Sequence, residues 1–143
     1  ALVIGRRCKD VAEAEAWACV LGLTCGIDVT ARDIQRADPQ WTRGKGFDTF
    51  CPLGPWIAAG VTEAQAATLQ LETRVNGELR QQASTGEMVF PPARLIAYIT
   101  QVMTLEPGDV ILTGTPEGVG RLAAGDRIEL EIEGVGVLSN TVV

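Results

Sequence analysis

The dipeptide Asn76–Gly77 is the feature of the sequence that most constrains the fold. Both residues tolerate a positive φ angle, which a two-residue type I′ turn requires. Apolar and polar residues alternate before it, over 69–75, as they do in a half-buried strand, and residues 78–84 can return as the partner strand. The sequence therefore predicts an antiparallel hairpin over 69–84 and a β-rich fold around it.

Apolar runs bounded by turn residues predict further strands. In the run 127–133, isoleucine and leucine alternate with glutamate, which is typical of a strand with one buried and one solvated face. The predicted fold class is α+β, mainly β, with strands that close into a roll or barrel and two flanking helices. The other predicted strands are 1–5, 21–29, 110–113 and 137–143.

Two helices of some length are expected. One is capped by Asp10 and reaches about Cys19, and the other begins at the Pro91–Pro92 pair. In the second helix an apolar stripe is expected to pack into the core (Leu95, Ile96, Ile99, Val102 and Met103). Short helical turns are predicted at 30–37 and 63–68, and residues 41–55 are expected to be irregular.

Composition excludes several classes of protein. The 143 residues suit one domain, and 12 basic against 18 acidic residues give a net charge of −6 without a basic run, which argues against nucleic acid and anionic membranes as partners. No apolar run is long enough to cross a membrane. Histidine is absent and the four cysteines lack CxxC spacing, so a zinc site of the usual type is not expected.

Cysteine use indicates a cytoplasmic protein. Cys19, Cys25 and Cys51 lie in apolar stretches and are expected to be buried, reduced thiols. The chain starts without methionine on the apolar run 1–4, and a strand rarely stands as a free end, so we expect that further residues precede it.

Asp28 is the first candidate functional residue, because a carboxylate at the end of an apolar run is costly to bury without a cation or several donors. It could ligate a hard cation such as Mg²⁺, Ca²⁺ or Mn²⁺. A turn acid bonded to backbone amides or to Arg32 is the alternative, and the residue alone favours that alternative. One acid does not make a divalent-cation site.

Two further segments carry candidates. Lys45 stands between glycines and could point a compact cation into a pocket, although an exposed loop lysine is the commoner case. The loop 114–120 could offer the hydroxyl of Thr115 and free backbone amides to an anion. It lacks the ending of a phosphate-binding P-loop, and a tight connection between strands explains it equally well.

Six motifs stand in order along nearly the whole chain, and together they resemble the fumarylacetoacetate hydrolase family. The motifs are LVIGR, DVTARDIQ, TRGKGFDTFCPLGPW, TRVNGELRQQASTGEMVF, LEPGDVILTGTPEGVG and AGDRIELEIEGVG. Each is weak alone, but six in the same order and spacing are specific. The resemblance implies a mixed β-roll, a homodimer, and a single domain over 1–143 that is truncated on its N-terminal side.

The resemblance also implies a divalent cation, usually Mg²⁺ or else Mn²⁺ or Ca²⁺, held by three carboxylates. Asp28 matches the third, and the first two would be glutamates upstream of Ala1, as would the family's histidine–glutamate pair. Lys45, Gln35 and Thr115 match positions that contact the substrate near the metal, with Lys45 as the catalytic group. Thr49 is expected to line the same loop. Ile27 departs from the pattern, because the family commonly has asparagine there.

Family members act on 2-oxo or β-dicarbonyl acids through a metal-stabilised enolate. The resemblance points to a 2-hydroxyhepta-2,4-diene-1,7-dioate isomerase or a related decarboxylase. One alternative is a C–C bond hydrolase of the acylpyruvate or fumarylacetoacetate type. Another is a non-catalytic fragment or degenerate half that serves as a dimerisation or binding module.

Overall fold

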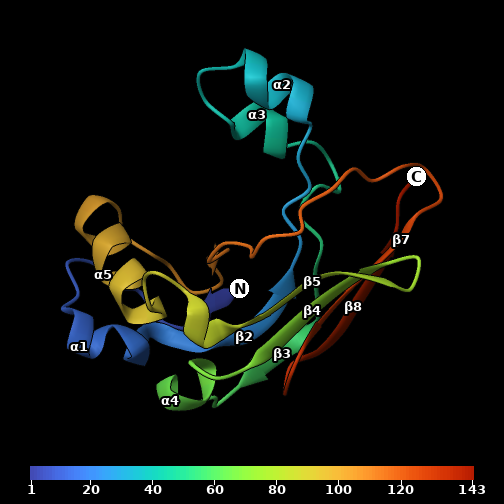
Figure 1. The fold of residues 1–143 in the computed structure, drawn as a ribbon. Coiled ribbons are helices and arrows are strands. Elements are labelled where there is room, and N and C mark those ends of the chain that lie inside the picture. Colours follow the sequence, from blue (N-terminus) through green and yellow to red (C-terminus); the bar gives the residue numbers. More distant parts are fainter.

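A computed structural model describes all 143 residues and contains two four-stranded sheets (Figure 1). Every strand pairing in both sheets is antiparallel, and the expectation of a mainly β fold is confirmed. The first sheet has the strand order β3-β2-β1-β6. Its strands are β1 (Leu2–Ile4), β2 (Val20–Gly26), β3 (Leu53–Ala59) and β6 (Val110–Ile111).

The second sheet has the order β5-β4-β7-β8, and its strands β4 and β5 form the predicted hairpin. Asn76 and Gly77 have φ angles of 53° and 82°, so both adopt the positive values that the turn requires. In β7 the aliphatic residues are buried and Glu131 is exposed, as the alternation predicts. The strands are β4 (Gln70–Val75), β5 (Glu78–Ser84), β7 (Arg127–Ile132) and β8 (Gly136–Thr141).

Helices are short, and only one exceeds six residues. The helix expected from Asp10 begins instead at Glu13 and becomes a 3₁₀ turn at Trp17–Cys19. Asp10 does not cap it, because the N-cap position falls at Ala12 and the Asp10 carboxylate is paired with Lys9. The α-helices are α1 (Glu13–Ala16), α2 (Arg32–Ala37), α3 (Thr42–Lys45), α4 (Glu63–Ala66) and α5 (Pro92–Val102), and a second 3₁₀ turn spans Thr85–Glu87.

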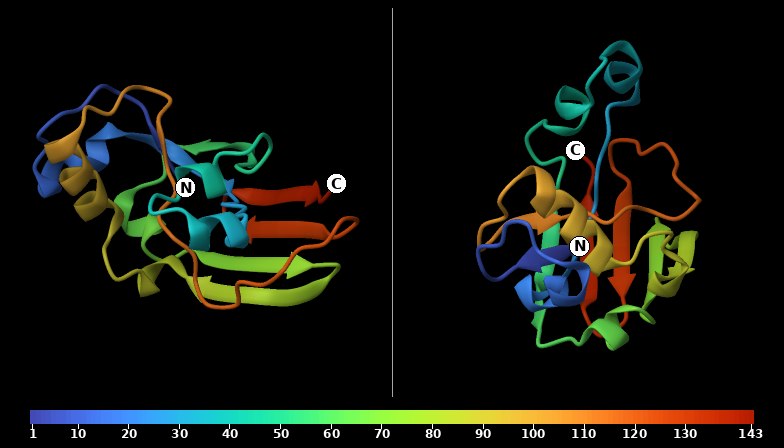
Figure 2. Two further views of the ribbon diagram at one scale, coloured as in Figure 1. Left: turned by 90° about the horizontal axis from the view of Figure 1, so that it is seen from above. Right: turned by 90° about the vertical axis from the view of Figure 1, so that its left-hand side faces the viewer.

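Helix α5 starts with a proline in its first turn, as predicted. It lies beside α1 at one end of the sheets (Figure 1 and Figure 2). Ile96 is fully buried, but Val102 and Met103 are 69% and 55% exposed. The expectation that these two residues pack into the core is wrong, because α5 ends at Val102 and both side chains are exposed at this end of the helix.

The core forms where the inner faces of the two sheets meet α1 and α5. Leu2 and Ile4 of β1 contribute from the first sheet, and Leu130 and Ile132 of β7 from the second. The sheets also meet through polar atoms, since the thiol of Cys25 lies 3.5 Å from the carbonyl oxygen of Gly136. No helix is long and apolar enough to span a membrane.

The segment 41–55 is more regular than expected, because it contains α3 and the first residues of β3. Cys51 lies in this segment and is exposed, which corrects the expectation that it is buried. All four cysteines are free, and Cys8, Cys19 and Cys25 are buried. Cys51 differs from them because it lies in the bend before β3, whereas Cys8, Cys19 and Cys25 all belong to the hydrophobic core.

Helices α2 and α3 stand away from both sheets, at the end of the two segments that leave β2 and enter β3 (Figure 1, and the right-hand view of Figure 2). We call residues 27–52 the arm. It carries Asp28, Gln35, Lys45 and Thr49, so four of the five predicted site residues belong to one projecting unit.

Candidate functional site

The base of the arm continues the antiparallel ladder of β2 and β3. The backbone N–H of Ile27 donates to the carbonyl of Pro52 at 3.1 Å, and that of Val29 donates to the carbonyl of Phe50 at 3.0 Å. Asp28 lies between these two bonded positions, two residues beyond the end of β2. The predicted strand over 21–29 therefore ends at Gly26, but its ladder fixes the backbone of Asp28 on both sides.

Lys45, the last residue of α3, forms an ion pair with the carboxylate of Asp28. Both side chains are partly open to solvent, with 31% of Lys45 and 41% of Asp28 exposed. The alternative in which Arg32 holds Asp28 is wrong, because the guanidinium of Arg32 bonds to Gln35 instead. The structure thus brings together the two residues that the sequence offered as metal ligand and electrostatic catalyst.

Two contacts place α3 so that Lys45 reaches Asp28. Gly44 is buried against α2, where a Cβ atom would lie 3.2 Å from the backbone nitrogen of Gln35. The guanidinium of Arg43 donates two hydrogen bonds, of 2.8 and 2.7 Å, to Asp38 at the end of α2. These hydrogen bonds hold the pKa of the Asp38 carboxyl below its ordinary value.

The Arg43–Asp38 pair was not singled out from the sequence. The only sequence signal for it is a basic residue five positions after an acidic one, on the far side of Pro39. Such a spacing is common on exposed surfaces, so it does not identify the pair without the fold.

Gln35 is half-buried on α2, and its side-chain oxygen accepts a hydrogen bond of 2.8 Å from Arg32. An arginine can only donate, so this contact fixes which end of the amide faces it. The NH₂ group of Gln35 is thereby left to donate to another acceptor.

Thr115 is held by the second sheet and not by the arm. Its side-chain oxygen accepts a hydrogen bond of 2.7 Å from the amide of Gln81 in β5, and the same amide donates to the carbonyl of Pro116 at 3.0 Å. Gln81 was missed in the sequence, where it is one polar residue in a strand. No hydrogen bond or ion pair joins Thr115 to Asp28 or Lys45.

Thr49 is exposed in a turn closed by the hydrogen bond from the N–H of Phe50 to the carbonyl of Phe47. Its φ of 70° is unusual for a β-branched residue. Strained residues of this kind are concentrated at ligand sites, so the observation keeps Thr49 among the candidates.

Residues 1–143 do not form a complete metal site. No group of three or more histidine, cysteine, aspartate or glutamate side chains is placed to hold a metal ion. Asp28 offers one carboxylate, whose charge is already balanced by Lys45. Mg²⁺ and Ca²⁺ take six or more oxygen ligands, so a cation at Asp28 would need ligands beyond those that this chain gathers.

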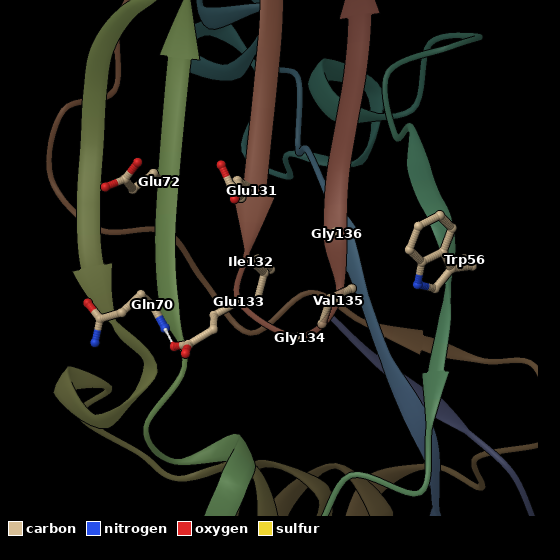
Figure 3. Close-up of a pocket in the computed structure, with 9 residues that line it drawn as sticks. All are labelled: Trp56, Gln70, Glu72, Glu131, Ile132, Glu133, Gly134, Val135 and Gly136. Carbon is tan, nitrogen blue, oxygen red and sulfur yellow. Dashed lines mark hydrogen bonds between the residues drawn. The ribbon is translucent and has the colours of Figure 1, made fainter.

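A hollow of about 590 Å³ lies away from the arm (Figure 3). Residues of β3, β4 and β7 line it, together with the turn from β7 to β8. Glu72, Glu131 and Glu133 line it, with Trp56 at one side, and none of the predicted site residues does. Glu72 is paired with Arg74 and also accepts from Gln82, while Glu133 accepts from the backbone of Gln70. Because none of the predicted site residues lines this hollow, we place the candidate site at the arm.

Over its full length the chain is similar to several proteins that are named as enzymes. A 2-hydroxyhepta-2,4-diene-1,7-dioate isomerase from Mycobacterium marinum superposes with a TM-score of 0.95 at 53% identity, covering 99% of this chain and 55% of that one. The mitochondrial oxaloacetate tautomerase Fahd2a of Rattus norvegicus is 46% identical over 151 residues, which cover 100% of this chain and 48% of the relative.

A third relative was solved with ligands. Maleylpyruvate hydrolase from Sphingobium sp. SYK-6, in complex with manganese(II) ion and pyruvate, has a TM-score of 0.88 and 40% identity, over 99% of this chain and 51% of that one. The chain spans about half the length of the curated relatives that it matches.

The family model described as "Fumarylacetoacetate (FAA) hydrolase C-terminal" matches residues 1–143. The six motifs, the two antiparallel sheets and the relatives agree with this match. The chain belongs to the fumarylacetoacetate hydrolase family.

Proposed function

We propose that the chain carries part of the active site of a divalent-metal-dependent enzyme that acts on 2-oxo or β-dicarbonyl carboxylic acids through an enolate. The observation that carries the proposal is the contact between Asp28 and Lys45, which places a hard oxygen ligand and a fixed positive charge at one partly open position. The preferred reaction is that of a 2-hydroxyhepta-2,4-diene-1,7-dioate isomerase or a related decarboxylase.

The side chains of this protein have separate roles in the proposal. A bound divalent cation would supply Lewis-acid stabilisation of negative charge, with Asp28 as one ligand. The ammonium of Lys45 adds a second positive group that needs no reorganisation as charge develops. The NH₂ of Gln35 and the hydroxyls of Thr115 and Thr49 would hold the substrate carboxylates in one orientation. The remaining metal ligands would come from residues outside 1–143.

Two other functions remain candidates. A C–C bond hydrolase of the acylpyruvate or fumarylacetoacetate type uses the same enolate and adds water, and one relative is named a maleylpyruvate hydrolase. A non-catalytic dimerisation or binding module would keep the fold without turnover.

We also propose the domain organisation, the oligomeric state, the partner and the cellular compartment of the protein. A single domain, truncated at its N-terminal side and paired as a homodimer, suits the family, and a small-molecule acid is the proposed partner. The four free thiols suit a reducing compartment such as the cytoplasm.

The deciding experiment uses the natural full-length protein with a panel of 2-hydroxyhepta-2,4-diene-1,7-dioate, oxaloacetate and an acylpyruvate. Each acid is assayed with Mg²⁺, with Mn²⁺ and after chelation, and products are identified by NMR. The proposal expects metal-dependent isomerisation or loss of CO₂. Cleavage of the acylpyruvate into two acids would favour the hydrolase, and no turnover together with no heat on Mg²⁺ titration would overturn the enzyme.

A further inference from the structure

We propose that Gln81 is a positioning residue, which fixes the Thr115 hydroxyl as a hydrogen-bond donor toward a carboxylate of the ligand. The inference rests on the proposed function, because it assigns a role within the same site. It concerns a residue of the second sheet whose side-chain hydrogen bonds go to the loop 114–120 and not to the arm.

One amide nitrogen makes both contacts. The Nε2 atom of Gln81 lies 2.7 Å from Oγ1 of Thr115 and 3.0 Å from the carbonyl oxygen of Pro116. An NH₂ group has two hydrogens, so each acceptor can take one of them. The amide therefore holds two consecutive residues of the loop 114–120 at once.

The direction of the bond decides what Thr115 can do. Its oxygen accepts from Gln81, so the hydroxyl hydrogen is not used in that contact and can be donated elsewhere. Thr115 is exposed, which leaves this hydrogen open to a ligand. A hydroxyl that is free to donate matches an anionic oxygen, which can only accept, and a carboxylate is the strongest such acceptor in a 2-oxo acid.

The support for Gln81 is rigid. It is half-buried in β5, opposite Thr73 of the neighbouring β4, in the hairpin that Asn76 and Gly77 close. The loop also touches the strand at the adjacent residue, where a Cβ atom on Gly118 would lie 1.9 Å from the carbonyl oxygen of Arg80. Gly118 has a φ of 98°, so the loop reaches β5 at a place that only glycine permits.

The competing explanation is that Gln81 only anchors the loop 114–120 to β5 and has no role in ligand binding. Two substitutions distinguish this explanation from the proposed one. Gln81→Ala removes both hydrogen bonds. Gln81→Glu keeps the shape, but its carboxylate can only accept, so it would draw the Thr115 hydrogen to itself and repel the Pro116 carbonyl. If Gln81 acts through Thr115, neither change should matter once the hydroxyl is gone, as in Thr115→Val.

The test uses the full-length protein with Mn²⁺ and pyruvate as the probe, measured by calorimetry. We expect Gln81→Ala to weaken pyruvate binding about 10-fold and Gln81→Glu more, as lost hydrogen bonds to charged groups do. In the Thr115→Val background the same changes should alter the affinity by less than about twofold, the sign of coupled residues. Gln82→Ala is the matched control, since Gln82 is exposed and bonds Glu72 instead.

NMR order parameters give a second measurement that does not depend on a ligand. The backbone N–H groups of residues 114–120 should have lower order parameters in Gln81→Ala and unchanged ones in Gln82→Ala. Equal losses of affinity with and without the Thr115 hydroxyl would overturn the role of Gln81, as would unchanged order parameters in Gln81→Ala. A wild-type protein that binds no pyruvate would overturn the proposed function, and with it the carboxylate assignment, whatever the order parameters show.

Discussion

The ammonium of Lys45 is paired with the carboxylate of Asp28, 17 residues earlier, and this contact joins the end of α3 to the segment that leaves β2. The pair lies at a partly exposed position, with 31% and 41% of the two side chains open to solvent. Exposed pairs contribute between about 0 and 1 kcal/mol to stability. We therefore expect the ion pair between Asp28 and Lys45 to contribute to catalysis and to add little to the free energy of unfolding.

Replacement of Lys45 tests whether the side chain contributes to catalysis without contributing to stability. Lys45→Met should lower kcat of the full-length enzyme by about 100-fold or more, because a fixed charge is lost where negative charge develops. The free energy of unfolding should change by less than about 1 kcal/mol. Lys9→Met is the matched control, since Lys9 also pairs with an aspartate, Asp10, outside the site. A large loss of stability with normal kcat would contradict the assignment.

The backbone conformation of Thr49 is expected to lower the free energy of unfolding of the protein. Its φ of 70° suits glycine, so Thr49→Gly is expected to raise the free energy of unfolding by about 1 kcal/mol. Thr68→Gly should instead lower it, because Thr68 has no such backbone angle. If the Thr49 hydroxyl binds substrate, KM should rise in the stabilised variant. Denaturant titration and steady-state kinetics measure the two effects, and destabilisation by Thr49→Gly would show that the turn carries no strain.

Thiol chemistry should distinguish Cys51 from the other three cysteines. Cys51 is exposed, whereas Cys8, Cys19 and Cys25 are buried. Burial raises the pKa of the Cys8 thiol to about 11, so almost none of it is thiolate at neutral pH. An aromatic disulfide reagent at pH 8 should react quickly with one thiol of the native protein and with four after denaturation. Cys51→Ser should abolish the fast phase, and a fast phase that survives would locate it elsewhere.

Acid should weaken the contact between the hairpin turn and β7. The backbone N–H of Ala123 and the amide of Asn76 donate to Asp126 and hold the pKa of its carboxyl below the ordinary 3.8. The unfolded chain then binds more protons, so this stabilisation is present above that value and is lost as pH falls through the folded pKa.

Asp126→Asn should consequently lower the Tm at pH 7, and the difference from wild type should narrow as the pH is lowered below 3.8. Asp48→Asn, at an exposed carboxylate without a hydrogen-bond partner, is the control and should leave the Tm unchanged at pH 7. Calorimetric scans across the pH range measure both. A difference that widens in acid would show that the charge of Asp126 destabilises the fold.

The middle and the C-terminal end of α5 should differ in their contribution to stability. Ile96 is fully buried, so Ile96→Ala is expected to cost about 2–5 kcal/mol. Val102 is 69% exposed, and Val102→Ala should cost less than about 0.5 kcal/mol. Urea titration of the two variants compares them directly. Similar costs would mean that Val102 is covered in solution, for example by a partner subunit.

The sequence by itself determined those features that depend on neighbouring residues. Asn76 and Gly77 specify their turn because few other residues adopt its φ angles, and the alternation in 127–133 specifies a strand with one buried face. The family motifs extend over the whole chain, and the resemblance makes Asp28, Gln35, Lys45 and Thr115 the candidate site residues. None of these patterns carries information on distances between segments.

Only the tertiary structure decided which of those residues meet. Lys45 reaches Asp28 because Gly44 and the Arg43–Asp38 contact place α3 against α2, and Thr115 is bonded to Gln81 because its loop crosses β5. The same holds for the exposed Val102 and Cys51, whose apolar surroundings in sequence suggested burial. Local periodicity fixes the direction of a side chain relative to its own element, whereas burial and pairing depend on which element packs against it.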